Sequence, residues 1–139
     1  MSEHEALLRI FIALGLGSLI GLERQIRGQF AGLKTHALVS LGSALFVVIS
    51  ELVIAQTGLN ADPLRMASQI IVGIGFIGGG AILHKSDSLV KGVSTAAGLW
   101  VAAGVGVAIG FGLYLIGVVV TAILVFLFAV IGPLEDKMK

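Results

Sequence analysis

The sequence predicts an all-α, polytopic integral membrane protein in which residues 1–139 form one domain with five membrane-spanning helices. Of the 139 residues, 57% are hydrophobic and only 12% are charged, and mean hydropathy is +1.07, values far from those of soluble domains. A helix needs about 20 apolar residues to cross a bilayer. Five segments meet this length: Ala6–Leu22, Thr35–Gln56, Leu64–Leu83, Val93–Gly112 and Leu113–Ile131.

The first apolar segment is expected to remain in the protein as a span. Glu3 and Glu5 precede it, Arg9 lies inside it, and no small-x-small cleavage site follows, so it does not read as a signal peptide. Composition also argues against nucleic-acid binding, because the net charge is +1 and the basic residues are spread over several loops. The absence of cysteine excludes disulfides and thiolate metal sites.

The distribution of basic residues predicts the orientation of the chain. An odd number of spans places the termini on opposite sides, and basic residues concentrate on the cytoplasmic side of a membrane. We therefore expect the N-terminus outside and the C-terminus in the cytoplasm. One side would carry only Arg9 and Arg65, and the other would carry Arg24, Arg27, Lys34, Lys85, Lys91, Lys137 and Lys139.

Glycine spacing predicts how the helices pack. Apolar contact between helices gains little in lipid, so close backbone approach through small residues has to supply the packing. Small residues recur four apart in the first, third and fourth spans, whereas the fifth span is bulkier and is expected to face lipid. The glycines predicted to mark helix contacts are Gly17, Gly21, Gly75, Gly79, Gly98 and Gly106.

An internal repeat would bring two cytoplasmic loops together. Residues 15–38 resemble residues 73–98 in the placement of their glycines, and GLKTHA after the first loop corresponds to GVSTAA after the second. Both copies run in the same direction, as parallel repeats do. Thr35 and Thr95 would each begin an entering helix. They are either simple N-caps or part of a site where two helix N-termini face an anion or a partner carboxylate.

The charged island between the first two spans supplies the rest of this candidate site. Arg24, Arg27 and Lys34 help to fix orientation, which leaves Glu23 and His36 without a topological role. We expect Glu23 or Arg24 to approach the N-terminal turn of the second helix. The predicted cytoplasmic site comprises Glu23, Arg24, Thr35, His36 and Thr95.

A second polar group is predicted near the outer face. Charges inside a bilayer are costly and tend to pair or to reach for the interface, so we expect either a structural arginine–carboxylate cluster or a substrate gate. Its members are Arg9, Glu51, Asp62, Arg65 and Gln69. Near the middle of each span the sequence has no ionisable residue, and Mg²⁺ requires hard oxygen ligands. We therefore expect no metal site, no cofactor and no enzymatic activity.

Three long stretches resemble the transmembrane domain of the MgtC/SapB family over roughly residues 7 to 130. They are LGLGSLIGLERQIRGQFAGLKTHALVSLGSALFVVIS, DPLRMASQIIVGIGFIGGGAIL and VKGVSTAAGLWVAAGVGVAIG. The family's motif positions fall on Gly21, Glu23, Arg24, Gly28, Gly32, Leu33, Thr35 and His36, and then on Asp62, Arg65, Gln69, Gly73, Gly75, Phe76, Gly78, Gly80, Gly92, Thr95, Ala97 and Trp100.

The resemblance implies a protein of the bacterial inner membrane linked to growth under magnesium limitation and, in pathogens, to survival inside host cells. It also implies a regulatory role through membrane protein partners, with the F-type ATP synthase as one proposed target. Members with the virulence role generally carry a soluble C-terminal domain, and we expect this chain to be a short form without it.

Two functions follow from the sequence. The first is a small regulator that binds other membrane proteins and forms a homo-oligomer, most simply a dimer. The alternative is a transporter or channel for Mg²⁺ or another small solute, with Arg65, Gln69 and Gly73 as its polar track.

Overall fold

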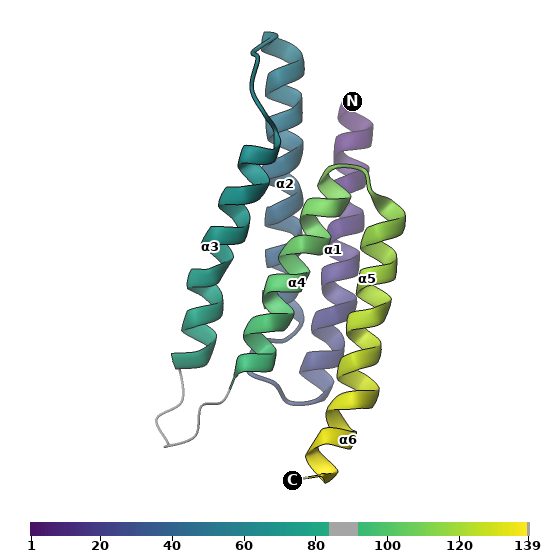
Figure 1. Cartoon of the computed structure of the whole chain (residues 1–139). Helices are drawn as coiled ribbons and strands as arrows, with labels where there is room; N and C mark the ends of the chain where they lie inside the picture. The colour runs from purple at the N-terminus through teal and green to yellow at the C-terminus, as the bar shows by residue number, and fades with distance from the viewer. Residues whose placement is uncertain (84–91, 139) are drawn as a thin grey trace.

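The structure, a computed structural model, describes residues 1–83 and 92–138. In this part of the chain all regular structure is helical (Figure 1), and five helices are long and apolar enough to cross a membrane. The predicted fold class is confirmed. His84, Lys85 and Lys91 lie outside the described residues. The elements are α1 (Glu3–Ile26), α2 (Leu33–Thr57), α3 (Leu64–Leu83), α4 (Val93–Gly110), α5 (Tyr114–Phe126), a π-helical turn (Leu127–Ile131) and α6 (Gly132–Lys137).

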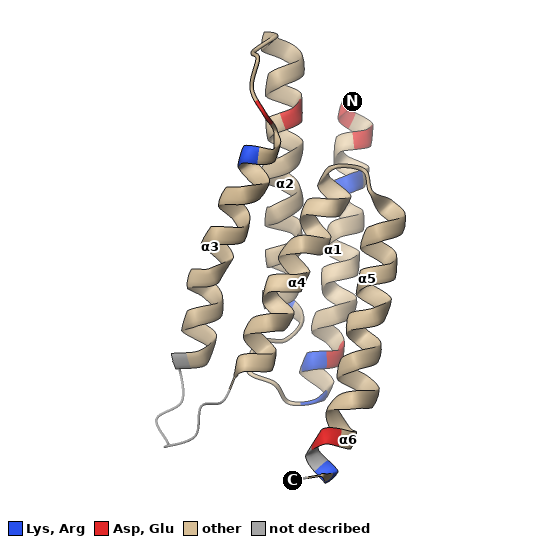
Figure 2. Ribbon diagram, in the orientation of Figure 1, with Lys and Arg blue, Asp and Glu red and all other residues tan. Residues whose placement is uncertain are grey.

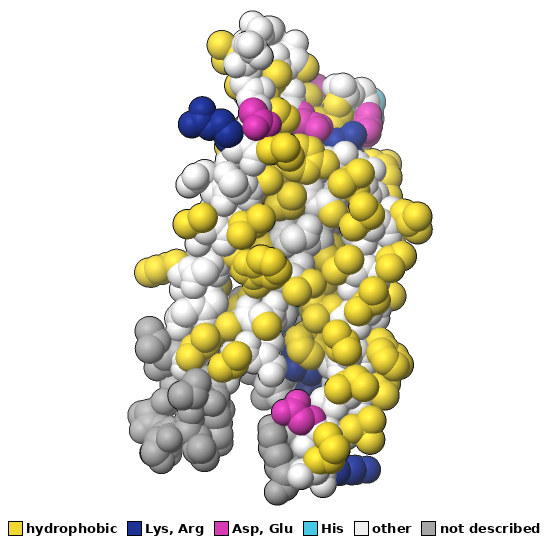
Figure 3. Space-filling view, viewed as in Figure 1, with side chains coloured by type: hydrophobic (Ala, Val, Ile, Leu, Met, Phe, Trp, Pro, Cys, Tyr) yellow, Lys and Arg dark blue, Asp and Glu magenta, His cyan; other side chains and the backbone are white. Residues whose placement is uncertain are grey.

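The spanning helices alternate in direction, so the two termini lie at opposite ends of the bundle (Figure 1). Charged residues gather at these two ends (Figure 2), and hydrophobic side chains cover the surface between them (Figure 3). We call the end with the N-terminus the Arg9 end and the opposite one the Arg24 end. This distribution suits a protein whose middle lies in hydrocarbon.

The centre of the bundle is a close approach of α1, α2 and α4. A Cβ atom built on Gly17 of α1 would lie 2.6 Å from the Ser40 Cβ and 2.7 Å from the His36 carbonyl oxygen, both on α2. On α4, a Cβ at Gly106 would overlap the carbonyl oxygen of Ser40. The Ser40 hydroxyl donates to the Ala13 carbonyl of α1 over 2.8 Å. One buried turn of α2 is therefore in close contact with α1 on one side and with α4 on the other.

The other predicted contact glycines fall into two groups. Gly21 lies against the start of α2, where a Cβ would be 2.6 Å from the Gly32 carbonyl oxygen, and Gly98 lies against the Phe128 ring. Gly75 and Gly79 of α3 have no neighbouring atom within 4 Å of a built Cβ. The predicted contact of these two glycines is therefore wrong within the chain, and the alternative, a contact across a dimer, stays a prediction.

The reason is the rotation of α3. This helix buries Ala67, Ile74 and Gly78, which recur along one face, and a Cβ on Gly78 would meet Ala96 of α4 at 3.6 Å. Gly75 and Gly79 each follow a buried residue by one position, which turns them about 100° away from α4. Gly75 and Gly79 consequently face away from α4.

The predicted threonine caps are also wrong. The N-caps of α2 and α4 are Gly32 and Gly92, which occupy equivalent places in the two halves of the sequence, and neither start has a side-chain cap of its own. Gly92 has φ of +94°, a conformation that favours glycine. Thr35 and Thr95 are the third residues of their helices.

The central packing yields a matched pair of substitutions on α4. Gly106→Ala should lower the free energy of unfolding by about 1–3 kcal/mol, because the added methyl group meets backbone that cannot move aside. Gly104→Ala should be neutral or stabilising by up to about 1 kcal/mol, since a Cβ there meets nothing within 4 Å. Unfolding in mixed micelles by a denaturing detergent measures both. Equal effects of the two substitutions would contradict the proposed packing.

Candidate functional site

The Arg24 end holds a compact ion-pair cluster at the end of α1. Arg24 is only 6% exposed, its Nε donates to the Glu23 carboxylate at 2.6 Å, and its guanidinium carbon lies 3.7 Å from the centre of the Phe128 ring. The Arg27 Nε lies 3.4 Å from the other oxygen of Glu23. One mostly buried carboxylate therefore pairs with two guanidinium groups, and Phe128 supports one of them by a cation–π contact.

Arg27 also completes the backbone of the last helical segment. Its Nη2 donates to the carbonyl oxygen of Ala129 over 2.9 Å. Pro133, four residues further on, has no N–H to give to that carbonyl, and its ring would collide with it in a regular helix. The chain widens into the π-helical turn Leu127–Ile131 immediately before this proline. Arg27 thus supplies the donor that the proline lacks.

His36 lies fully buried behind this cluster. Its Nδ1 donates to the Gly32 carbonyl oxygen at 3.0 Å, while Nε2 has no hydrogen-bond partner among the described residues. The absent side chain of Gly98 makes room for the Phe128 ring, because a Cβ there would lie 2.8 Å from that ring, and the His36 Nε2 lies beside the same position, 3.5 Å from the built Cβ. Thr95 is buried one turn earlier on α4.

Most residues of the predicted cytoplasmic site lie at the Arg24 end of the bundle. The side chain that contacts the start of α2, however, is that of Gln25 and not that of Glu23. Arg24 and His36 both lie close to Phe128, and Thr35 is partly exposed. The free N–H of Leu33 at the start of α2 is satisfied by the side-chain oxygen of Gln25 at 3.2 Å, whereas Glu23 pairs with the two arginines.

Sequence reasoning missed three members of this cluster: Gln25, Arg27 and Phe128. Pro133 carried a usable signal for Arg27, since a proline late in an apolar helix leaves a carbonyl without its donor. Nothing comparable marks Gln25 or Phe128, because a glutamine near a loop and a phenylalanine in an apolar span fit many surroundings.

At the Arg9 end, Arg9 joins three helices. Its guanidinium is paired with Glu5 of α1, donates to Glu51 of α2 at 2.9 Å and donates to the Gly110 carbonyl at the end of α4 at 2.8 Å. Carbonyls at a helix C-terminus have no partner within the helix, so a buried cation is favourable there. Arg9 and Glu51 therefore stabilise this end of the bundle.

The other predicted members of the outer cluster lie apart from Arg9. Asp62 accepts a hydrogen bond from the Leu64 N–H at 2.9 Å and so caps α3. Arg65 and Gln69 are exposed, one turn apart on α3. Among the described residues, no ion pair links Asp62 or Arg65 to the Arg9 group.

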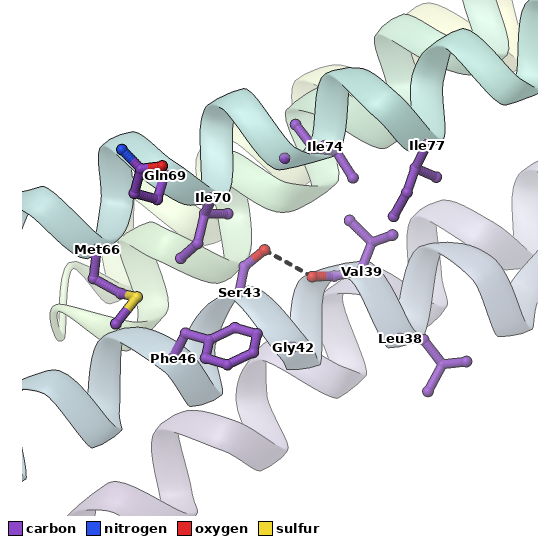
Figure 4. Close-up of a pocket in the computed structure, with 11 residues that line it drawn as sticks. Leu38, Val39, Gly42, Ser43, Phe46, Met66, Gln69, Ile70, Ile74 and Ile77 are labelled. Atoms are coloured by element: carbon purple, nitrogen blue, oxygen red, sulfur yellow. Dashed lines mark hydrogen bonds between the residues drawn. The ribbon is translucent and has the colours of Figure 1, made fainter.

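An apolar groove of about 430 Å³ lies between α2 and α3. Phe46 and Ile70 project into it from the two helices, and Gln69 stands at its rim (Figure 4). The Ser43 hydroxyl in its wall is satisfied, because it donates to the Val39 carbonyl at 2.8 Å. The groove is lined almost wholly by apolar atoms and offers no charged group. It therefore suits an apolar chain or side chain better than an ion.

The described residues contain no group of three or more His, Cys, Asp or Glu side chains that could hold a metal ion. The arginine–glutamate cluster joins the end of α1 to the π-helical turn that follows α5. Its chemistry is that of binding and positioning, with guanidinium groups as donors.

Comparison with known proteins identifies the chain's relatives. The model of the MgtC family matches residues 10–137. Protein MgtC of Brucella abortus is 46% identical over 89% of this chain and 50% of its own length. A protein of Escherichia coli K12 named "Putative magnesium transporter YhiD" is 40% identical over 82% of this chain and 54% of its own.

An uncharacterized protein of Synechocystis is 48% identical over 70% of this chain and 39% of its own length. The chain thus spans about half the length of the curated relatives it matches, or less. No solved structure matches it.

The role assigned to Arg27 is tested by a double-mutant cycle with Pro133. Arg27→Gln should destabilise the protein by about 1 kcal/mol through the lost bond to Ala129, a modest value because Arg27 is partly exposed. In the Pro133→Ala background the helix regains its own N–H donor, so Arg27→Gln should cost much less there. Detergent unfolding of the four proteins measures the coupling. The same cost in both backgrounds would refute the role, because the Glu23 contact is lost in both.

Proposed function

Because the chain belongs to the MgtC family, we propose that it is a regulatory protein of the bacterial inner membrane that acts by binding other membrane proteins. Its role would be adaptation to magnesium limitation and, in pathogens, intracellular survival. The F-type ATP synthase is the partner that we propose to test first. In this proposal the Arg9 end faces outward and the Arg24 end faces the cytoplasm.

The observation that carries the proposal is the outer face of α3. Gly73, Gly75 and Gly80 are exposed, no atom of the chain lies within 4 Å of a Cβ built on any of them, and Phe76 beside them is 88% exposed. Small residues let two backbones approach closely, which is how helices associate in lipid. The contact glycines of α1 and α4 meet their neighbours inside the chain, but those of α3 remain available.

The groove between α2 and α3 adjoins this face and shares Gly73 with it. A partner helix seated on the glycines would have Phe76 beside it and an apolar hollow into which to insert a side chain. The homodimer expected from the sequence would use the same surface, because the contact glycines of α1 and α4 are already occupied.

The transport alternative has its own support. The E. coli relative is named as a magnesium transporter candidate, and Gln69 and Gly73 both line the α2–α3 groove. Against it stands the apolar wall of that groove, which offers Mg²⁺ few of the oxygen ligands it requires. Magnesium flux into proteoliposomes above that of empty vesicles would favour transport over partner binding.

Substitution of an exposed glycine on α3 tests the regulatory proposal. Gly75→Leu should leave helicity and membrane level unchanged, because the side chain points into open space, but should abolish growth in low magnesium of a strain that depends on this protein. Gly15→Leu is the control: Gly15 of α1 is also exposed and also meets nothing within 4 Å. Normal growth with Gly75→Leu would show that the outer face of α3 is not needed for the function.

The orientation is tested with single cysteines in this cysteine-free chain. His4 and Met138 are both exposed. In intact cells an impermeant thiol reagent should label His4→Cys and should not label Met138→Cys until the membrane is opened. The reverse pattern would place the Arg24 end outside.

A further inference from the structure

A polar cavity of about 620 Å³ opens at the Arg24 end, separate from the α2–α3 groove. Three parts of the chain surround it: the end of α1 with the loop that follows, the first turn of α4, and the π-helical turn with α6. In Figure 3 basic side-chain atoms are visible in a recess beside α5 at this end. The cavity wall includes Arg24, Arg27, Gln29, Ser94, Phe128 and Glu135.

The two arginines on this wall are held in place before any ligand arrives. Arg24 is clamped between Glu23 and the Phe128 ring, and Arg27 is held by Glu23 and the Ala129 carbonyl. A guanidinium carries five N–H donors, and the bond from Arg24 Nε to Glu23 uses one of them. Because the side chains are already ordered, little conformational entropy is lost when they bind a further acceptor.

The hydrogen-bond donors of the cavity suit a phosphate group, while its two arginines and two carboxylates balance in formal charge. Glu23 neutralises one of the two guanidinium groups, and Glu135 adds a carboxylate to the wall. The 18-residue helix α4 reaches the cavity wall at Ser94, in its first turn, and the first turn of a helix carries free N–H groups and the positive end of the helix dipole. Arginine and helix N-termini are the groups that recognise phosphate oxygens.

The same cavity also has an apolar side. Leu127 and Ile131 line it and are each 44% exposed, on the segment that continues the lipid-facing helix α5. A phospholipid whose phosphate meets the arginines would therefore find apolar surface for the beginning of its acyl chains. A soluble phosphate would use only the polar wall.

We propose that this cavity binds the phosphate group of a phospholipid headgroup or of a soluble phosphate compound, with Arg24, Arg27 and the first turn of α4 as its donors. The proposal does not depend on partner binding by α3, since the two surfaces share no residue.

The test compares the melting temperature of the full chain, purified and delipidated in a non-ionic detergent, with and without three probes. The probes are phosphatidylglycerol, phosphatidylethanolamine and inorganic phosphate. A rise with either lipid but not with inorganic phosphate assigns a lipid site. A rise with inorganic phosphate as well assigns a general phosphate site. No rise with any probe overturns the proposal.

Two variants locate the effect. Gln29→Glu and Ser94→Asp each place a carboxylate on the cavity wall at an exposed position, and an acidic residue in the first turn of α4 does not harm the helix. Each should at least halve the rise in melting temperature. Gln56→Glu makes the same charge change at the opposite end and should match the unmodified chain. An undiminished rise in both cavity variants would show that the probe binds elsewhere and would overturn the assignment.

Discussion

The structure depends on the absence of a Cβ atom at a few glycines where α1, α2 and α4 meet. At Gly17 and Gly106 the backbones of α1 and α4 press against the same buried turn of α2 around Ser40. In water such helices would be held together largely by apolar burial, but lipid removes that driving force. Backbone contact, supplemented by the bond from Ser40 to Ala13, has to replace it. Once these three helices are fixed, α3 and α5 can only occupy the periphery.

The two ends of the bundle are secured by arginines of α1, by different means. Arg9 donates to Glu51 and to the last carbonyl of α4, that of Gly110, which joins helices that already touch. Arg24 and Arg27 reach the π-helical turn that follows α5, through the Phe128 ring and the Ala129 carbonyl. The second arrangement leaves a polar cavity beside the arginines, whereas α3 leaves Gly73, Gly75 and Gly80 exposed. The chain thus separates a charged end, where we propose that a phosphate group binds, from an apolar flank, where we propose that a partner helix binds.

Much of this architecture could be predicted from the sequence, because bilayer thickness and glycine spacing are strong constraints. The five spans and the contacts of α1 follow from them. The rotation of α3 could not be predicted, since its glycines occupy more than one face and the sequence does not say which face meets α4. The sequence predicts helix starts at Thr35 and Thr95 because threonine is a common N-cap. The actual N-caps are glycines, whose role depends on backbone angles rather than on side-chain chemistry. The contact between Arg24 and Phe128 joins residues more than 100 positions apart, and no local sequence pattern predicts it.

The central claim is that α3 presents a face that the chain itself leaves open and that a partner covers. Oxygen accessibility of a nitroxide label measures this directly, with the label placed at Phe76 on α3 or at the buried Ala103 on α4. In nanodiscs that hold one copy of the protein, the label at position 76 should be as accessible as lipid-exposed sites, and the label at 103 should be protected. In membranes of cells grown in low magnesium, the label at 76 should become protected. Protection at 76 already in the single copy, or unchanged accessibility in those membranes while the protein still supports growth, would contradict the account.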